Sequence, residues 1–337
     1  SNYRITLDDA TVARKYSEIG GFNMTLQITN FIGGNKFKYG LSMEGYNTDY
    51  LNVNQYGIYT EQKEPTTNLS AFATYKWTNG RLLLDPGVRL VYYATLNEPQ
   101  LEPRLAVKYN INDNVRLKFA GGFYSQVFLD ARSDNDIVNL FNGFLTGTGA
   151  LNLPSTFRGK EVSTCVQRAE HAVLGAEYDF DEHISFNAEV YFKYFNQLLN
   201  ANRNKMYDES DPAYQSGPYE KPDYLLKDFI IESGFATGFD VSTTVDLERL
   251  YVWATYSLGF VQRKDEIQTY NPHYDRRHTV NLLATYALGE QREWELSGRW
   301  SFGSGYPFTQ TQGIYQMLGF SDGFAGDYTR ENGRYGI

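Results

Sequence analysis

The chain repeats one pattern, in which apolar and polar residues alternate over short stretches that are joined in pairs by tight turns. Between Lys36 and Glu44 the odd positions are Phe, Tyr, Leu and Met, and the even positions are Lys, Lys, Gly, Ser and Glu. A period of two places every second side chain on the same face of a β-strand. Phe22–Thr29 alternates in the same way, and Gly33–Asn35 between the two stretches favours a tight turn. The pattern predicts a β-hairpin with one apolar and one polar face.

The same unit recurs along the chain, and we predict six consecutive hairpins with twelve strands. The later turns are expected at Thr78–Gly80, Asn112–Asn114, Asp181–Glu182, Leu247–Arg249 and Gly289–Arg292. The stretch Tyr3–Val12 is a candidate for a further strand. Pro86 lies on the apolar register inside a predicted strand. Because proline has no backbone N–H to donate, we expect a bulge or a strand start there.

The connections between the hairpins are longer and more polar than the turns within them. They are expected at Asn47–Thr67, Val127–Val166 and Leu198–Ser233, with shorter ones at Ala94–Glu102 and Gln262–Tyr274. Short turns at one end and long loops at the other are typical of outer-membrane barrels, whose long loops are extracellular.

Charge separates the two faces of every predicted strand. No Asp, Glu, Lys or Arg falls on the apolar register, where a cationic side chain in contact with lipid would cost about 2–4 kcal/mol at the bilayer midplane. The opposite register carries the charges and therefore predicts a wide interior that is filled with water or with a plug. The charged residues of that register are Lys76, Arg81, Asp85, Arg89, Arg104, Lys108, Arg116, Lys118, Glu177, Glu189, Lys193, Asp240, Glu295 and Arg299.

These patterns predict an all-β fold: a transmembrane antiparallel up-and-down β-barrel, of which at least twelve strands are visible. A soluble β-sandwich also alternates, but its strands run about 5–6 residues, and most patterns here persist for about ten, enough to cross a bilayer. An open sheet edge is not viable in a membrane. We therefore expect residues 1–337 to be a section of a single, larger outer-membrane barrel domain.

Several motifs resemble the barrel of TonB-dependent outer-membrane transporters. They are Glu102–Tyr109 followed by Asn112–Asn114 and Gly122–Gln126, then Tyr274–His278, Trp294–Ser297 and Ser304–Thr309. The last two blocks look most like the subgroup with a carboxypeptidase-regulatory-like N-terminal domain. The resemblance covers most of the chain, and it is the order and spacing of the motifs that make it specific.

The resemblance implies a barrel of 22 strands closed by an N-terminal plug, located in the cell outer membrane, which imports scarce solutes with energy relayed by TonB. The lipid bilayer and, through the plug, TonB are then the expected partners. This chain departs from the family pattern, because no plug and no TonB box are visible. Its end at Gly336–Ile337 also lacks an aromatic-ended final strand, so we expect neither plug nor final strand within the chain.

Candidate contacts to a solute lie in the polar connections and at one strand end. The tyrosine-rich loop Tyr207–Tyr224 also carries carboxylates, and aromatic and carboxylate groups suit recognition of a solute or a partner. The candidates are Tyr207, Tyr214, Tyr219, Asp275, Arg276 and Arg277. Two alternatives are that the tyrosines pack within a solvated loop, and that Asp275–Arg277 form a charged collar where a strand leaves the membrane. His273 and His278 flank Asp275, but no third ligand has recognisable metal-site spacing, so no metal site is predicted.

Other function classes find little support in the sequence. The net charge of -9 argues against a nucleic-acid partner. No nucleophile elbow, P-loop or paired zinc motif occurs, so we predict neither enzymatic activity nor a cofactor. The leading hypothesis is an active transporter. The alternatives are a structural or docking barrel that holds a surface lipoprotein or another complex partner, and a passive porin.

Overall fold

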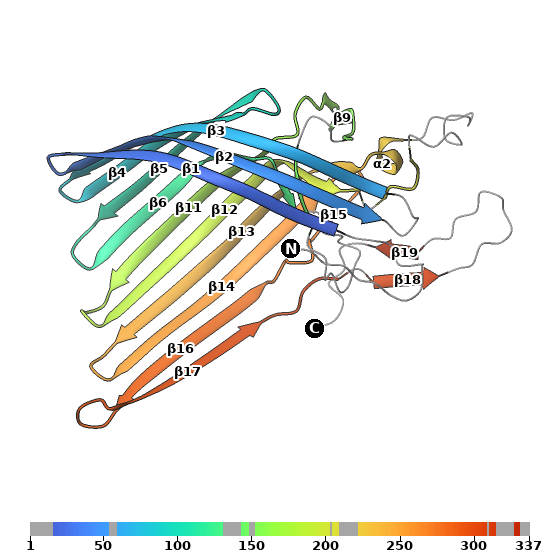
Figure 1. The fold of residues 1–337 in the computed structure, drawn as a ribbon. Helices are drawn as coiled ribbons and strands as arrows, with labels where there is room; N and C mark the ends of the chain where they lie inside the picture. The colour runs from blue at the N-terminus through green and yellow to red at the C-terminus, as the bar shows by residue number, and fades with distance from the viewer. Residues whose placement is uncertain are drawn as a thin grey trace.

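The computed structural model describes residues 16–53, 59–130, 143–147, 152–202, 204–208, 222–308, 310–314 and 327–330. Twelve long antiparallel strands lie side by side in a curved wall, each beside its neighbour in the chain (Figure 1). They are β1 (Tyr16–Ile32), β2 (Asn35–Val53), β3 (Tyr59–Asn79), β4 (Leu82–Tyr93), β5 (Glu98–Asn110), β6 (Val115–Gln126), β11 (Gln167–Asp179), β12 (Ile184–Ala201), β13 (Phe229–Asp246), β14 (Leu250–Lys264), β16 (His278–Leu288) and β17 (Trp294–Gly303).

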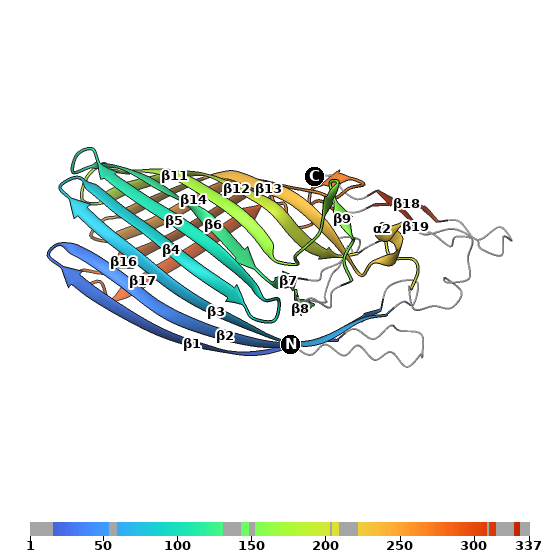
Figure 2. The same ribbon diagram turned by 90° about the horizontal axis from the view of Figure 1, so that it is seen from above.

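This wall confirms the predicted all-β, up-and-down architecture and its twelve strands. The described part of the wall is not closed, since β1 and β17 stand at its two edges and are not paired with each other there. Viewed from above, β1–β3 lie in front and β14–β17 behind, so the wall curves around an interior (Figure 2). Among the residues that the structure describes, no helix is long and apolar enough to cross a membrane. The candidate strand Tyr3–Val12 lies outside the described residues.

The predicted turns form at one end of the wall and connect the strands within each hairpin. Gly33 and Gly80 adopt positive φ angles of 60° and 56°, which glycine reaches without a Cβ clash. Tight turns of this kind need such angles to reverse the chain in two residues. The turn residues therefore set the register that places the apolar rows on one face.

At the other end, the strands run further than their apolar pattern. The predicted connection Asn47–Thr67 was wrong, because β2 and β3 stay paired from Asn47↔Pro65 to Val53↔Tyr59. The outward-facing Glu61 and Lys63 lie on this extension and are exposed. Backbone pairing continues where the outer side chains become polar, so alternation marks the apolar band and not the ends of the strands.

Three other predicted connections are shorter than expected for the same reason. The stretch Ala94–Glu102 reduces to a four-residue turn between Tyr93 of β4 and Glu98 of β5. The predicted connection Leu198–Ser233 is shorter because β12 extends to Ala201 and β13 begins at Phe229. The predicted connection Gln262–Tyr274 is shorter because β14 extends to Lys264.

Pro86 starts no strand and causes no bulge, contrary to the prediction. It lies inside β4 with its side chain exposed, and it pairs with Leu105 of β5 in unbroken register. Only the ladder to β3 is interrupted, between the pairs Thr74↔Gly87 and Trp77↔Leu84, which keep the same register. A single missing N–H therefore costs a local gap in one ladder and leaves the alignment of the strand unchanged.

Short elements lie beyond the ends of the wall strands on the side opposite the turns, which we call the loop end. They are β7 (Phe128–Asp130), β8 (Phe144–Thr146), β9 (Thr156–Phe157), β10 (Lys160–Glu161), α2 (Asp223–Leu226), β15 (Thr269–Tyr270), β18 (Gln310–Ile314) and β19 (Asp327–Arg330). The strands β7 and β8 pair with each other and lie inside the curve, where β8 contacts β1–β3 and β7 contacts β12 (Figure 2).

Candidate functional site

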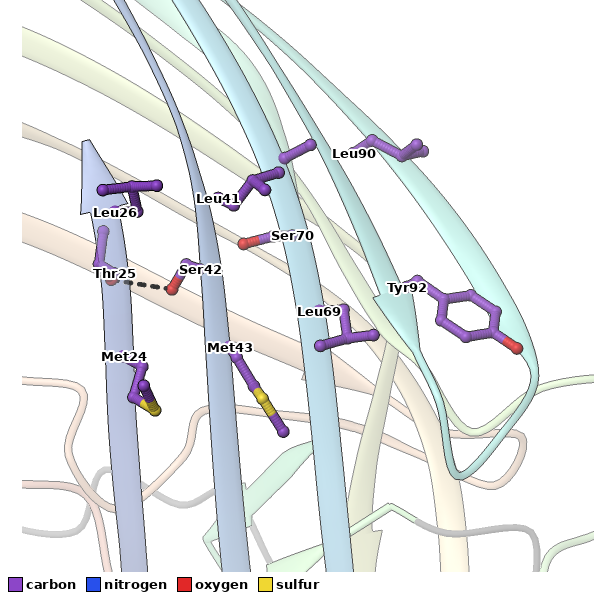
Figure 3. Close-up of a pocket in the computed structure, with 11 residues that line it drawn as sticks. Met24, Thr25, Leu26, Leu41, Ser42, Met43, Leu69, Ser70, Leu90 and Tyr92 are labelled. Atoms are coloured by element: carbon purple, nitrogen blue, oxygen red, sulfur yellow. Dashed lines mark hydrogen bonds between the residues drawn. The ribbon is translucent and has the colours of Figure 1, made fainter. Parts of the chain in front are cut away.

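The outer face of the wall is a continuous apolar surface. Leu26, Leu174 and Leu296 are each exposed by more than 60%. On β1–β4, a shallow groove of about 580 Å³ runs between apolar side chains, and the only interaction drawn across it is the Thr25–Ser42 hydrogen bond (Figure 3). The groove arises because the small Ala71 lies in one row with the larger Leu41 and Leu90. An apolar exterior of this kind suits contact with lipid chains.

The inner face carries paired charges near the turn end of β5, β6, β11 and β12. One oxygen of Glu177 lies 2.8 Å from the Lys118 ammonium, and the other lies 2.7 Å from Arg116 Nε and 3.3 Å from Lys108 Nζ. Lys118 also reaches Glu189, at 3.1 Å. The side chains stay partly exposed, so the charges are both paired and open to water, as expected for the lining of an aqueous interior.

The loop end of the interior is filled by the segment that we call the strap, residues 127–130 and 143–147, which contains β7 and β8. Leu129 and Leu145 of the strap are buried in an apolar cluster with side chains of β2, β12 and β13. We call this cluster the mouth core. Its buried members are Tyr50, Leu129, Leu145, Cys165, Leu199, Phe229 and Ile231.

Sequence reasoning missed the strap and the mouth core. The strap lies in the region that was expected to be one polar connection, Val127–Val166, and the mouth core takes its buried side chains from all three long predicted connections. The available signal was the pair of apolar dipeptides Phe128–Leu129 and Phe144–Leu145 within that region. Too few apolar residues follow one another there to show a period, so only the packing against distant strands reveals their role.

Cys165 reports on the packing of the mouth core. Its side chain is 4% exposed, and burial raises the pKa of the thiol to about 11. Because the thiolate is the reactive form, we expect alkylation by iodoacetamide at pH 8 to be at least about 100-fold slower than for a cysteine in a short peptide. Mass spectrometry of the labelled protein measures this rate. Labelling at the peptide rate would contradict a closed mouth core.

Asp275–Arg277 lie on the connection between β14 and β16, at the loop end. Asp275 is fully buried; its Oδ1 accepts a hydrogen bond from Val261 N–H at 3.0 Å, and its Oδ2 lies 3.1 Å from Arg277. The Arg277 guanidinium stacks over the Phe260 ring, with 4.2 Å to its centroid. These contacts fasten the connection to β14.

Arg276 is placed differently from its two neighbours. Its guanidinium lies over the ring of Tyr306, 4.1 Å from the centroid, and is packed so closely against Gly303 that a Cβ there would meet it at 2.4 Å. Its Nε atom is buried and has no hydrogen-bond partner among the described residues.

The tyrosine-rich loop is only partly described. The Tyr207 backbone N–H donates to Leu225 O of α2 at 3.2 Å, whereas Tyr214 and Tyr219 lie outside the described residues. Tyr207 and the Asp275–Arg277 connection both lie at the loop end. Within the described ranges, no group of three or more His, Cys, Asp or Glu side chains could hold a metal ion.

A cavity of about 440 Å³ lies among the loops on this end, with an apolar floor and an acidic rim. Two rim carboxylates tie the loops together. Asp223 Oδ2 accepts from Ser155 N–H at 3.0 Å, and Glu266 Oε1 accepts from Arg158 N–H at 2.8 Å. Because these carboxylates accept hydrogen bonds from the backbone of a neighbouring loop, they hold the loops of the rim together.

No family model and no curated protein matches the chain. Solved structures do match. The FrpB iron transporter of Neisseria meningitidis aligns with a TM-score of 0.55 at 11% identity, over 94% of this chain and 47% of that one. The siderophore receptor PirA of Acinetobacter baumannii aligns at 0.54 and 13% identity, over 85% and 42%. The alcaligin outer-membrane receptor FauA of Bordetella pertussis aligns at 0.51 and 14% identity, over 87% and 47%.

The chain thus spans a little less than half the length of the solved structures it matches. At these identities the likeness establishes a shared fold. That fold is the wall of a β-barrel of the kind found in outer-membrane transporters, and it confirms the architecture predicted from the sequence.

Proposed function

From the barrel fold of the TonB-dependent outer-membrane transporters, which this chain shares over twelve strands, we propose that it forms part of an active importer. The importer takes up a scarce solute with energy relayed by TonB. The observation that carries the proposal is the separation of the two faces of the wall. The outer face is apolar, and the inner face holds paired, partly exposed charges such as those of Glu177 and Lys118.

The structural neighbours support transport in preference to the other classes. Among them are an iron transporter, a copper transporter and a siderophore receptor. Energy relay requires a plug that contacts TonB. This part of the proposal concerns the whole protein and rests on the sequence resemblance. The solute itself is left open by the proposal, with siderophore, glycan, peptide and vitamin as the classes to test.

Four of the predicted contact residues are proposed to contact the solute at the extracellular mouth of the barrel. They are Tyr207, Tyr214, Tyr219 and Arg276. Asp275 and Arg277 are proposed to act mainly by holding the β14–β16 connection in place, because their atoms are engaged with β14.

The test measures growth and uptake in a strain that lacks the gene for this protein, complemented or not, with each solute class as the limiting nutrient. Uptake that needs both this gene and TonB supports the proposal. Uptake that persists without TonB would instead indicate a passive porin. Loss of a stable surface complex without any uptake defect would indicate a docking barrel.

A further inference from the structure

The wall holds the main chain of the strap by side-chain hydrogen bonds. Ser17 Oγ of β1 accepts from Phe144 N–H at 3.0 Å, and the Gln62 side-chain amide of β3 donates to Thr146 O at 3.0 Å. From the opposite side, the Gln167 amide of β11 donates to Phe128 O at 2.5 Å. Groups from three wall strands therefore bind backbone N–H and C=O groups, which every peptide carries whatever its sequence.

Between these hydrogen bonds, one side chain from each strand of the strap enters the mouth core. Leu145, which precedes Thr146 in β8, is fully buried, and Leu129, its pairing partner in β7, is 3% exposed. Main-chain hydrogen bonds combined with pockets for alternate side chains are how proteins recognise extended peptides.

The inner face of β3 has further hydrogen-bonding capacity beyond Gln62. Thr66 and Asn68 lie four and six residues further along β3, toward its turn end, and they are 1% and 8% exposed. Thr66 Oγ1 and Asn68 Oδ1 are buried without a hydrogen-bond partner among the described residues. A buried acceptor without a partner is unfavourable, so a ligand that supplies N–H groups here gains affinity that the strap does not provide.

We propose that the inner face of β1–β3 at the loop end is a binding site for an extended peptide, and that the strap occupies this site as an internal substitute until a peptide displaces it. The inference names a ligand class for the proposed transporter and rests on the proposed function for its physiological purpose. Binding itself is measured without transport, so the two can fail separately.

The experiment compares binding of one probe to the detergent-purified, full-length protein and its variants. The probe is a fluorescein-labelled peptide with the sequence of residues 142–149, which includes β8, and binding is followed by fluorescence polarisation. In Leu145→Ala, which loosens the strap but leaves Ser17 and Gln62 intact, we expect the probe to bind at least about tenfold more tightly than in the unaltered protein.

A disulfide lock provides the opposite change. The hydroxyl oxygens of Thr48 and Thr146 are 3.2 Å apart, so Thr48→Cys with Thr146→Cys, in a Cys165→Ser background, can tie the strap to the wall. Oxidation is expected to abolish probe binding, and reduction to restore it. The matched control is Thr25→Cys with Ser42→Cys, whose native hydroxyls are 3.0 Å apart and which links β1 to β2 without touching the strap. This control should bind the probe equally in both redox states.

Removing the groups that hold the main chain tests the site itself. In the Leu145→Ala background, Ser17→Ala with Gln62→Ala is expected to raise the dissociation constant of the probe at least about tenfold. Heat-modifiable electrophoretic mobility verifies that each variant is folded, and Leu129→Ala replaces Leu145→Ala if the latter fails this check. Three results would each overturn the proposal. They are binding of the probe to the oxidised lock as tight as to the reduced one, no binding of the probe to Leu145→Ala or to Leu129→Ala, and displacement of the probe by maltoheptaose as effective as by the unlabelled peptide.

Discussion

Asp275→Ala is expected to lower the free energy of unfolding by about 3 kcal/mol, because breaking a buried ion pair leaves its partner charge uncompensated. The change also removes the acceptor for Val261 N–H and the carboxylate beside Arg277. Urea unfolding in lipid vesicles, followed by tryptophan fluorescence, measures the loss.

Two further variants set the scale for Asp275→Ala. Asp275→Asn keeps an acceptor oxygen and should lose clearly less stability. Glu61→Ala removes an exposed carboxylate at the same end of the wall and should change stability by less than about 0.5 kcal/mol. Unchanged stability in Asp275→Ala, combined with a loss of solute uptake, would contradict the fastening role and favour direct solute contact.

Leu174→Arg is expected to reduce the stability of the inserted protein by about 2–4 kcal/mol, since it places a cation on the outer face near the middle of β11. Leu174 is 61% exposed on that face. The matched control is Val173→Arg, which places the same side chain one residue away, on the inner face. Folding yield into vesicles and urea unfolding both report the difference.

The pair of variants decides which face of the wall meets lipid. If the outer face contacts lipid, Leu174→Arg is the damaging change and Val173→Arg is tolerated. Equal effects of the two substitutions would contradict a lipid-facing exterior, and a larger effect of Val173→Arg would reverse the assignment of the faces.

Alternation in the sequence predicted the hairpins, their turns and the orientation of their side chains, because the membrane demands an apolar outer register. It could not predict the ends of the strands at the loop end. Beyond Tyr46, β2 continues to Val53 with a mixture of polar and apolar residues on its outer face, because water imposes no period there. These outer residues are Asn47, Asp49, Leu51 and Val53. The prediction at Pro86 failed because the long ladders to β3 and β5 keep β4 in register, and one residue without an N–H does not shift them.

The candidate site was less predictable than the wall. The charge pattern around Asp275 drew attention to this strand end, but it could not show that Asp275 is fully buried and accepts a hydrogen bond from β14. The strap escaped prediction because its neighbours in space are distant in sequence. Leu145 packs with Tyr50 and Phe229, and nothing local in the chain encodes that contact.

The strap also has a consequence for the order in which the protein folds. Each wall strand pairs with its neighbour along the chain, so the hairpins can form with little loop-closure entropy. The strap contacts bridge 127 residues from Ser17 to Phe144 and 98 residues from Thr48 to Thr146. Non-local contacts form late, so we expect backbone amides of β8 to gain hydrogen-exchange protection after those of β5 and β6. The newly inserted barrel would then pass through a stage in which its mouth is open, before the interior is occupied.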